Sequence, residues 1–165
     1  MKPRITFITT GGTYDKDYAI GAGSYDFIIA DSAIPQVLAP VNPNFDSEII
    51  SLLRKDSTDI TDADRKLIFD ACAKAASGKI IITHGTDTMT ETAKVLSAIE
   101  DKTIILTGSS KPQSFKVTDA EFNLGMAVAA VQTLQAGVYI IMSGRIYPWD
   151  GCRKDPKTGQ FVEKF

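Results

Sequence analysis

Four short runs of aliphatic residues constrain the fold of this chain more than any other feature of its sequence. The runs are Ile5–Thr9, Lys79–Thr83, Thr103–Thr107 and Val138–Met142. Their apolar residues are continuous rather than alternating, which is typical of strands that are covered on both faces. A weaker run spans Asp46–Leu53. We therefore expect a mostly parallel sheet buried between two layers of helices.

Helical patterns lie between these runs, as repeated βαβ units require. A capping box at Thr61 precedes one helix, and the similar sequence Thr118–Glu121 precedes another. A third helix should begin near Thr86 or Asp87. Its buried face should contain Met89, Ala93, Leu96 and Ile99. The sequence thus predicts a single α/β domain over residues 1–165, with a three-layer, open and mostly parallel sheet flanked by helices.

Two segments depart from this alternation. Residues 14–24 are polar and contain Gly21 and Gly23, a composition that indicates a flexible loop or a hairpin. Residues 147–165 are rich in Lys, Asp, Pro and Gly. We expect this C-terminal tail to lie across the surface or against a partner subunit.

Composition and charge exclude several classes of function. The 165 residues include 18 Lys and Arg against 20 Asp and Glu, which gives a formal net charge of −2. The chain therefore lacks the excess of positive charge that typically attracts nucleic acid. A single histidine, His84, argues against a structural zinc site, and Cys72 and Cys152 are predicted to be a core and a loop residue. We expect no metal and no cofactor. No apolar run is long enough to cross a membrane and no signal peptide is recognisable, which favours a cytoplasmic protein without membrane contact.

Glycines and hydroxyl residues follow the carboxyl ends of the predicted strands. They form the segments Thr10–Thr13, Lys55–Asp59, His84–Thr88 and Gly108–Ser110. In an open α/β sheet, ligands bind outside these ends, where the strand order reverses. Glycines at such positions allow backbone N–H groups to approach a ligand closely. The sequence therefore predicts a small-molecule site at this edge of the sheet.

Each of these residues also has a purely structural interpretation. Thr86 or Asp87 alone could be a helix cap. His84 is best interpreted as a structural or orienting residue, because the sequence has no G-x-S-x-G elbow to supply a serine nucleophile. Ser114 and Lys116 resemble a Ser–Lys dyad only weakly and favour a solvated loop.

At Thr10–Thr13 (TGGT) and His84–Met89 (HGTDTM) the sequence resembles the bacterial-type L-asparaginases. Those enzymes carry both elements in this order, the second at the start of a helix. The similarity continues through Gly108–Pro112 and Asp119–Leu124. It covers nearly the whole chain but only half of the usual enzyme, so the chain is similar to short asparaginases that consist of the N-terminal domain alone.

The resemblance implies catalytic roles for five residues: Thr13, Tyr18, Thr86, Asp87 and Lys154. Thr13 matches the threonine that attacks the side-chain amide, and Tyr18 matches the tyrosine of a flexible active-site loop that assists it. Thr86, Asp87 and Lys154 form a second cluster. Lys157 is the alternative lysine, because the local spacing differs from that of the longer enzymes.

The resemblance also implies substrate-binding roles for Gly12, Asp56, Ser57, Gly85 and Ser109. Asp56 and Ser57 fall where the family holds the α-carboxylate of the substrate. The backbone carbonyl of Ser109 falls where the family contacts the leaving amide.

The chemistry of amide hydrolysis is consistent with these assignments. A threonine hydroxyl is a weak nucleophile that an adjacent base must activate, here a tyrosine or a lysine. Backbone N–H groups of Gly12, Thr13 and the Gly85–Asp87 turn are candidate donors to the oxyanion. The resemblance thus implies hydrolysis of L-asparagine to L-aspartate and ammonia through a threonine nucleophile and an acyl-enzyme.

Two alternatives stay open at this point. One is a glutaminase or another small-amide hydrolase, because one methylene is discriminated by only about 1–3 kcal/mol. The other is a non-catalytic module that binds asparagine or aspartate. The longer enzymes use an acidic residue of the second domain of a neighbouring subunit, so we also expect a homodimer or homotetramer in which a partner can complete the site.

Overall fold

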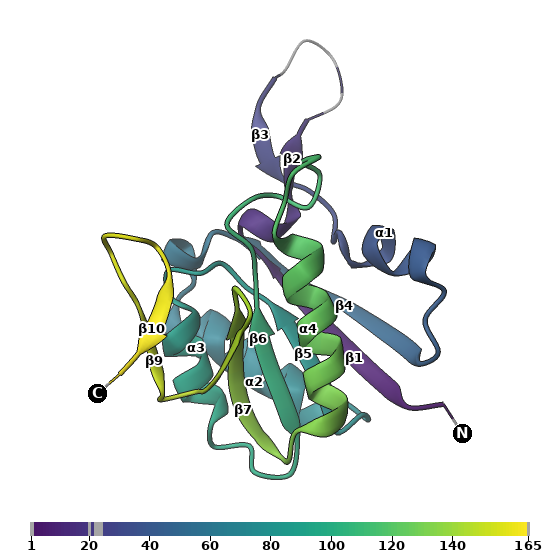
Figure 1. Cartoon of the computed structure of the whole chain (residues 1–165), viewed down its shortest axis with the longest axis vertical. Coiled ribbons are helices and arrows are strands. Elements are labelled where there is room, and N and C mark those ends of the chain that lie inside the picture. The colour runs from purple at the N-terminus through teal and green to yellow at the C-terminus, as the bar shows by residue number, and fades with distance from the viewer. Residues whose placement is uncertain (1, 20, 22–24, 165) are drawn as a thin grey trace.

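The computed structural model describes residues 2–19, 21 and 25–164 (Figure 1). Within these ranges the main sheet has six strands in the order β4–β1–β5–β6–β7–β8. Their bounds are β1 Arg4–Gly11, β4 Asp46–Lys55, β5 Lys79–Thr83, β6 Thr103–Thr107, β7 Gly137–Met142 and β8 Arg145–Pro148. The pairs from β4 to β7 are parallel, and β8 runs antiparallel to β7. The expected mostly parallel sheet is confirmed.

Helices cover both faces of the sheet, which confirms the three-layer arrangement. The helices are α1 Ile34–Leu38, α2 Asp62–Lys74, α3 Met89–Leu96 and α4 Ala120–Thr133. Helices α2 and α3 lie on one face, and α1 and α4 lie on the other (Figure 1). Short 3-10 turns at Thr13–Asp15, Ala39–Val41 and Ser57–Asp59 connect the elements.

Strand β5 shows why the apolar runs are continuous. Ile80 and Ile82 pack into a core cluster with residues of α2 and α3. Ile81 points the other way, into a cluster with residues of α1 and α4. All three side chains are fully buried. Each fully buried isoleucine contributes roughly 1.5–3 kcal/mol to the free energy of unfolding. A polar residue facing either side of the sheet would therefore destabilise this strand.

Of the three predicted helix starts, that of α2 agrees with the sequence expectation, and those of α4 and α3 differ from it. At α2 the capping box at Thr61 is present, with reciprocal hydrogen bonds between Thr61 and Asp64. At α4, by contrast, Asp119 is the N-cap residue but its side chain makes no capping hydrogen bond. Its carboxylate instead accepts from the N–H groups of Ser110 and Lys111. The expected capping box at Thr118 was therefore wrong, because the helix begins one residue later and the Thr118 hydroxyl instead donates to the carbonyl of Lys111 and accepts from the N–H of Ala120.

Helix α3 begins at Met89, later than expected from Thr86 or Asp87. The preceding turn is held by Ser57, whose carbonyl accepts from Thr88 Oγ1 at 2.6 Å. The four apolar residues predicted for its buried face, Met89, Ala93, Leu96 and Ile99, are all buried. The periodicity thus identified the buried face correctly and the start incorrectly.

Three hairpins complete the fold over the described residues. Strands β7 and β8 are joined through Ser143 and Gly144, both with positive φ (52° and 85°), as a two-residue turn of the primed type requires. Strands β2 (Lys16–Tyr18) and β3 (Phe27–Ile29) pair antiparallel and project beyond the sheet (Figure 1). For the described part of residues 14–24 the hairpin alternative is therefore confirmed. Residues 20 and 22–24, which include Gly23, lie outside the described residues.

The C-terminal tail folds onto its own domain. Strands β9 (Cys152–Lys154) and β10 (Phe161–Glu163) pair antiparallel. Tyr147, Cys152 and Phe161 are buried in the α2–α3 side of the core. The prediction that Cys152 is a loop residue was therefore wrong, because β9 directs it into the core. Residue 165 lies outside the described residues, and no described helix is long and apolar enough to cross a membrane.

Candidate active site

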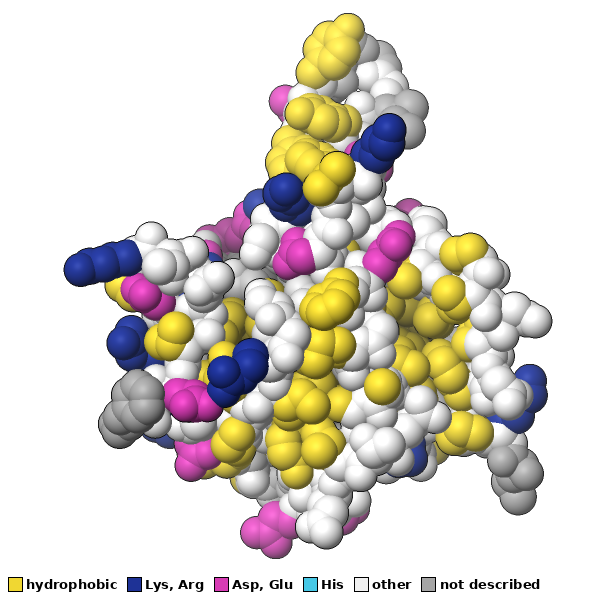
Figure 2. Space-filling view, viewed as in Figure 1, with side chains coloured by type: hydrophobic (Ala, Val, Ile, Leu, Met, Phe, Trp, Pro, Cys, Tyr) yellow, Lys and Arg dark blue, Asp and Glu magenta, His cyan; other side chains and the backbone are white. Residues whose placement is uncertain are grey.

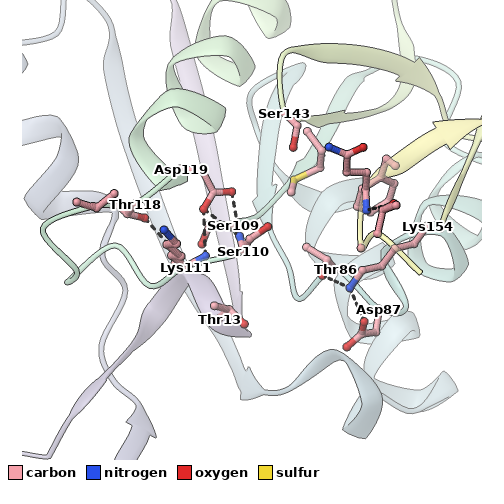
Figure 3. A pocket seen from close by; sticks show the side chains of 16 residues that line it. Thr13, Thr86, Asp87, Ser109, Ser110, Lys111, Thr118, Asp119, Ser143 and Lys154 are labelled. Carbon is pink, nitrogen blue, oxygen red and sulfur yellow. Dashed lines mark hydrogen bonds and ion pairs between the residues drawn. The ribbon is translucent and has the colours of Figure 1, made fainter. Parts of the chain in front are cut away.

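A cavity of about 750 Å³ opens at the carboxyl edge of the sheet (Figure 3). Strand order reverses between β1 and β5, because β4 lies on one side of β1 and β5 on the other. Thr13 follows β1 and Thr86 follows β5, so both come from the switch point where α/β sheets bind ligands. Five of the ten predicted site residues line this cavity: Thr13, Thr86, Asp87, Ser109 and Lys154.

Two glycines allow the loops after β1 and β5 to touch. Gly12 has φ of +72°, and a Cβ atom there would lie 2.6 Å from the backbone nitrogen of Gly85. A Cβ atom on Gly85 would lie 2.7 Å from Cβ of Ser57. No side chain fits at either distance. The predicted glycines therefore act through close backbone packing, which places Thr13 and Thr86 at the same cavity.

Lys154 reaches this edge of the sheet from β9. Its Nζ donates to Thr86 Oγ1 at 2.7 Å and to Asp87 Oδ1 at 2.5 Å (Figure 3). The Lys154 side chain is 27% exposed and so is partly shielded from water, whereas the Asp87 side chain is 59% exposed. Of the two candidate lysines, Lys154 is the one that lies against Thr86 and Asp87. Lys157 is in the turn that follows.

Asp56 and Ser57 are not among the described residues that line the cavity. Asp56 forms an ion pair with Lys16 of β2 at 2.8 Å. Ser57 is buried, and its Oγ accepts from the N–H of Asp87 at 3.1 Å. Ser57 thus supports the turn that carries Asp87, and its direct contact with the substrate stays a prediction.

Tyr18 is not among the described residues that line the cavity. It stands on β2, is 58% exposed, and packs its ring 5.3 Å from that of Phe27 across the hairpin. Phe27 in turn lies 6.0 Å from Phe115. The ring contact with Phe27 holds the tyrosine on the hairpin in this structure, and its assistance to Thr13 stays a prediction.

Two of the expected oxyanion donors are already engaged. The N–H of Gly12 donates to the carbonyl of Lys55 at 2.9 Å. The N–H of Asp87 donates to Ser57, as described above. The N–H groups of Thr13, Gly85 and Thr86 therefore stay as the candidate donors at this edge.

Asp119 and Asn123 support the loop after β6, which forms one wall of the cavity. Sequence reasoning assigned these two residues no role. Asp119 accepts from the N–H groups of Ser110 and Lys111. Asn123 is fully buried, donates to the carbonyl of Gly108 at 2.9 Å and accepts from the N–H of Ser143 at 3.0 Å. These bonds fix the loop after β6. The signal for them was present as an Asp and an Asn four residues apart on one helix face.

His84 is a structural residue, as the sequence interpretation favoured. Its ring is buried between the carbonyl of Gly85, 2.7 Å from Nδ1, and the hydroxyl of Thr92, 2.8 Å from Nε2. Burial lowers the pKa of His84 to about 4, so the ring is neutral near pH 7. It orients the Gly85 turn and does not line the cavity. Across the described ranges, no group of three or more His, Cys, Asp or Glu side chains is arranged to hold a metal ion.

Comparison with known proteins agrees with this geometry. The family model for the N-terminal domain of asparaginase matches residues 4–159. The chain belongs to the asparaginase family. The match covers both threonine-bearing loops and the strand that carries Lys154.

Individual relatives show how the asparaginase family varies. A glutaminase-asparaginase of Acinetobacter glutaminasificans is 31% identical over 88% of this chain and 48% of its own length. A glutamyl-tRNA(Gln) amidotransferase component of Methanosphaera stadtmanae is 34% identical over 87% of this chain and 34% of its own length. The solved L-asparaginase of Thermococcus kodakarensis superposes with a TM-score of 0.84 at 25% identity, over 97% of this chain and 51% of that enzyme. The chain thus spans about half the length of such relatives or less.

Proposed function

We propose that this asparaginase-family chain is an amide hydrolase that converts L-asparagine to L-aspartate and ammonia. The observation that carries the proposal is the contact of Lys154 with both Thr86 and Asp87, at the cavity that Thr13 also lines. A lysine beside a hydroxyl, with a carboxylate to orient it, supplies the base that a threonine requires. The glutaminase-asparaginase relative supports the same class of reaction.

In the proposed reaction, the Thr13 hydroxyl oxygen attacks the carboxamide carbon and its proton passes to a base. Lys154 is that base once it has lost a proton to solvent, and the Thr86 hydroxyl relays the proton to it. The N–H groups of Thr13 and Thr86 stabilise the oxyanion. The C–N bond then breaks, the relayed proton leaves with ammonia, and an aspartyl ester of Thr13 remains. Water hydrolyses this ester, releases L-aspartate and restores the hydroxyl.

A module that binds asparagine or aspartate without turnover is the second candidate. It is favoured by one observation: Tyr18, the expected partner of Thr13, packs on the hairpin and not beside the cavity. Glutamine is the alternative substrate within the enzyme class, since relatives of this chain carry glutaminase-asparaginase and glutamyl-tRNA amidotransferase names.

Ammonia release and calorimetry on the purified chain separate these possibilities. We expect ammonia release from L-asparagine, and a lower kcat/KM for L-glutamine. Binding of L-asparagine with no ammonia would favour the binding module. A higher kcat/KM for L-glutamine would favour the glutaminase.

Assembly and location stay predictions of this proposal. We expect a homodimer or homotetramer in which a partner subunit completes the substrate site. Light scattering on the purified chain and fractionation of cells test the oligomeric state and the cytoplasmic location.

A further inference from the structure

Ser109 carries a buried hydroxyl that has no hydrogen-bond partner among the described residues. The residue is 2% exposed and lines the cavity after β6, next to the strand that leads to Thr86. A buried hydroxyl without a partner is unfavourable for folding, because it has lost its hydrogen bonds to water. Its position at the cavity wall suggests that a ligand supplies the missing partner.

The backbone on either side of Ser109 is held rigidly. The carbonyl of Gly108 accepts from Asn123, and the N–H of Ser110 donates to Asp119 at 2.9 Å. These bonds fix the position of the Ser109 backbone at the cavity wall. Figure 3 shows Ser109 beside Ser110 and Asp119, on the wall of the cavity that Thr13 also lines. Figure 2 shows one face of the whole molecule as a space-filling view, in which the β2–β3 hairpin projects from the rest of the domain.

The acidic groups of the cavity are already engaged. The Asp87 carboxylate accepts from Lys154, and the Asp119 carboxylate accepts from two backbone N–H groups and from Asn123. A primary carboxamide brings two N–H donors into the cavity, and each needs an acceptor. The Ser109 hydroxyl oxygen is a buried acceptor that the described residues leave free.

We propose that the Ser109 side-chain hydroxyl accepts a hydrogen bond from the carboxamide NH₂ of the substrate and so selects primary amides. This inference rests on the proposed amide hydrolysis, and it assigns to the hydroxyl a role separate from that of the Ser109 backbone carbonyl. A site that is built to hydrogen-bond an N–H disfavours substrates that lack it, because its own polar group is then left unpaired.

Thr83 provides a matched control within the same chain. Its hydroxyl is also buried and without a partner among the described residues, but Thr83 is not among the residues that line the cavity. Ser109→Ala and Thr83→Val each remove one unpaired hydroxyl. Neither should lower Tm, because no protein hydrogen bond is lost. Only Ser109→Ala should change how the substrate is handled.

The test compares L-asparagine with the β-methyl ester of L-aspartate, which has no N–H on its reacting group. We expect Ser109→Ala to lower kcat/KM for L-asparagine roughly tenfold, the effect of about one hydrogen bond, and to leave kcat/KM for the ester within about twofold of wild type. Thr83→Val should leave both unchanged. Equal losses on the two substrates, or no loss on either, would overturn the assignment.

A binding measurement keeps this test independent of turnover. In a Thr13→Ala background, calorimetry should show L-asparagine bound roughly tenfold more weakly after Ser109→Ala. Equal Kd values would overturn the role of Ser109. If the wild-type chain hydrolyses neither substrate, the proposed function fails, while the calorimetric comparison still decides whether Ser109 contacts the amide.

Discussion

Lys154 Nζ lies 2.7 Å from Thr86 Oγ1, although the two residues are 68 positions apart in the chain. The contact joins the C-terminal β9–β10 hairpin to the switch point of the sheet. The C-terminal tail therefore forms part of the cavity lining in this structure. The burial of Tyr147, Cys152 and Phe161 in the core holds the tail in this position.

Replacing Lys154 tests whether this contact serves the reaction. Lys154→Met should lower kcat for L-asparagine by at least about a hundredfold, since general-base contributions are typically 10²–10⁴-fold. Lys157→Met, in the turn of the same hairpin, should retain the wild-type rate. Steady-state ammonia release measures both. A Lys157→Met loss that matched that of Lys154→Met would show that the hairpin matters only as a scaffold.

The two threonines should be required for turnover but not for folding. Thr13→Ala and Thr86→Val should each abolish measurable ammonia release and shift Tm little, because both residues line the cavity. Thr13→Ser should keep part of the activity, since it keeps the hydroxyl. If either Thr13→Ala or Thr86→Val works at nearly the wild-type rate, that threonine has no chemical role.

Gly85→Ala should destabilise the domain and reduce turnover together. The new Cβ atom would meet Cβ of Ser57 at 2.7 Å, so the loops after β4 and β5 must separate. We expect a loss of about 1–3 kcal/mol in the free energy of unfolding, as for other overpacked sites. Gly125→Ala is the control, because Gly125 lies in α4 with nothing within 4 Å of the added atom. There alanine should stabilise the helix by about 0.5–1 kcal/mol. Denaturant titration of both variants checks the difference.

Asp15 gives the fold a pH dependence with a defined sign. Burial raises the pKa of its carboxyl from 3.8 to about 6 in the folded chain, although the N–H of Ala33 donates to it at 2.9 Å. The folded state therefore binds the proton more tightly than the unfolded state. The stability from this group is complete below pH 3.8 and is lost as pH rises through about 6.

Asp15→Asn isolates this effect, because the amide is neutral at every pH and keeps an acceptor for Ala33. Its gain in Tm over wild type should grow between about pH 4 and pH 6 and then stay constant. The exposed Asp46→Asn is the control and should show no such growth. A gain for Asp15→Asn that does not change with pH would contradict the burial argument.

Local sequence pattern predicted the buried parts of this fold well. Isoleucines at adjacent positions, such as Ile80 and Ile81, require cover on both faces of a strand, and the structure provides it. The antiparallel strand β8 was not predicted. Its signal was the dipeptide Ser143–Gly144, which forms a primed turn, but two residues specify a hairpin only when a neighbouring strand edge is free to pair.

The site was harder to predict, because its geometry depends on contacts between distant segments. The resemblance indicated Lys154 and the two threonines, but not that Lys16 would pair with Asp56. Nor does a sequence show that an aromatic stack places Tyr18 on the projecting hairpin. Tertiary packing decides which of several possible partners a side chain contacts. Local sequence propensities do not contain this information.

Rapid-quench mass spectrometry of the wild-type chain with L-asparagine tests the central claim most directly. We predict an aspartyl adduct that forms within the first turnover, maps to the peptide containing Thr13 and is absent from Thr13→Ala. Ammonia release without any adduct on that peptide, or an adduct on a different residue, would contradict the claim that Thr13 is the nucleophile of this cavity.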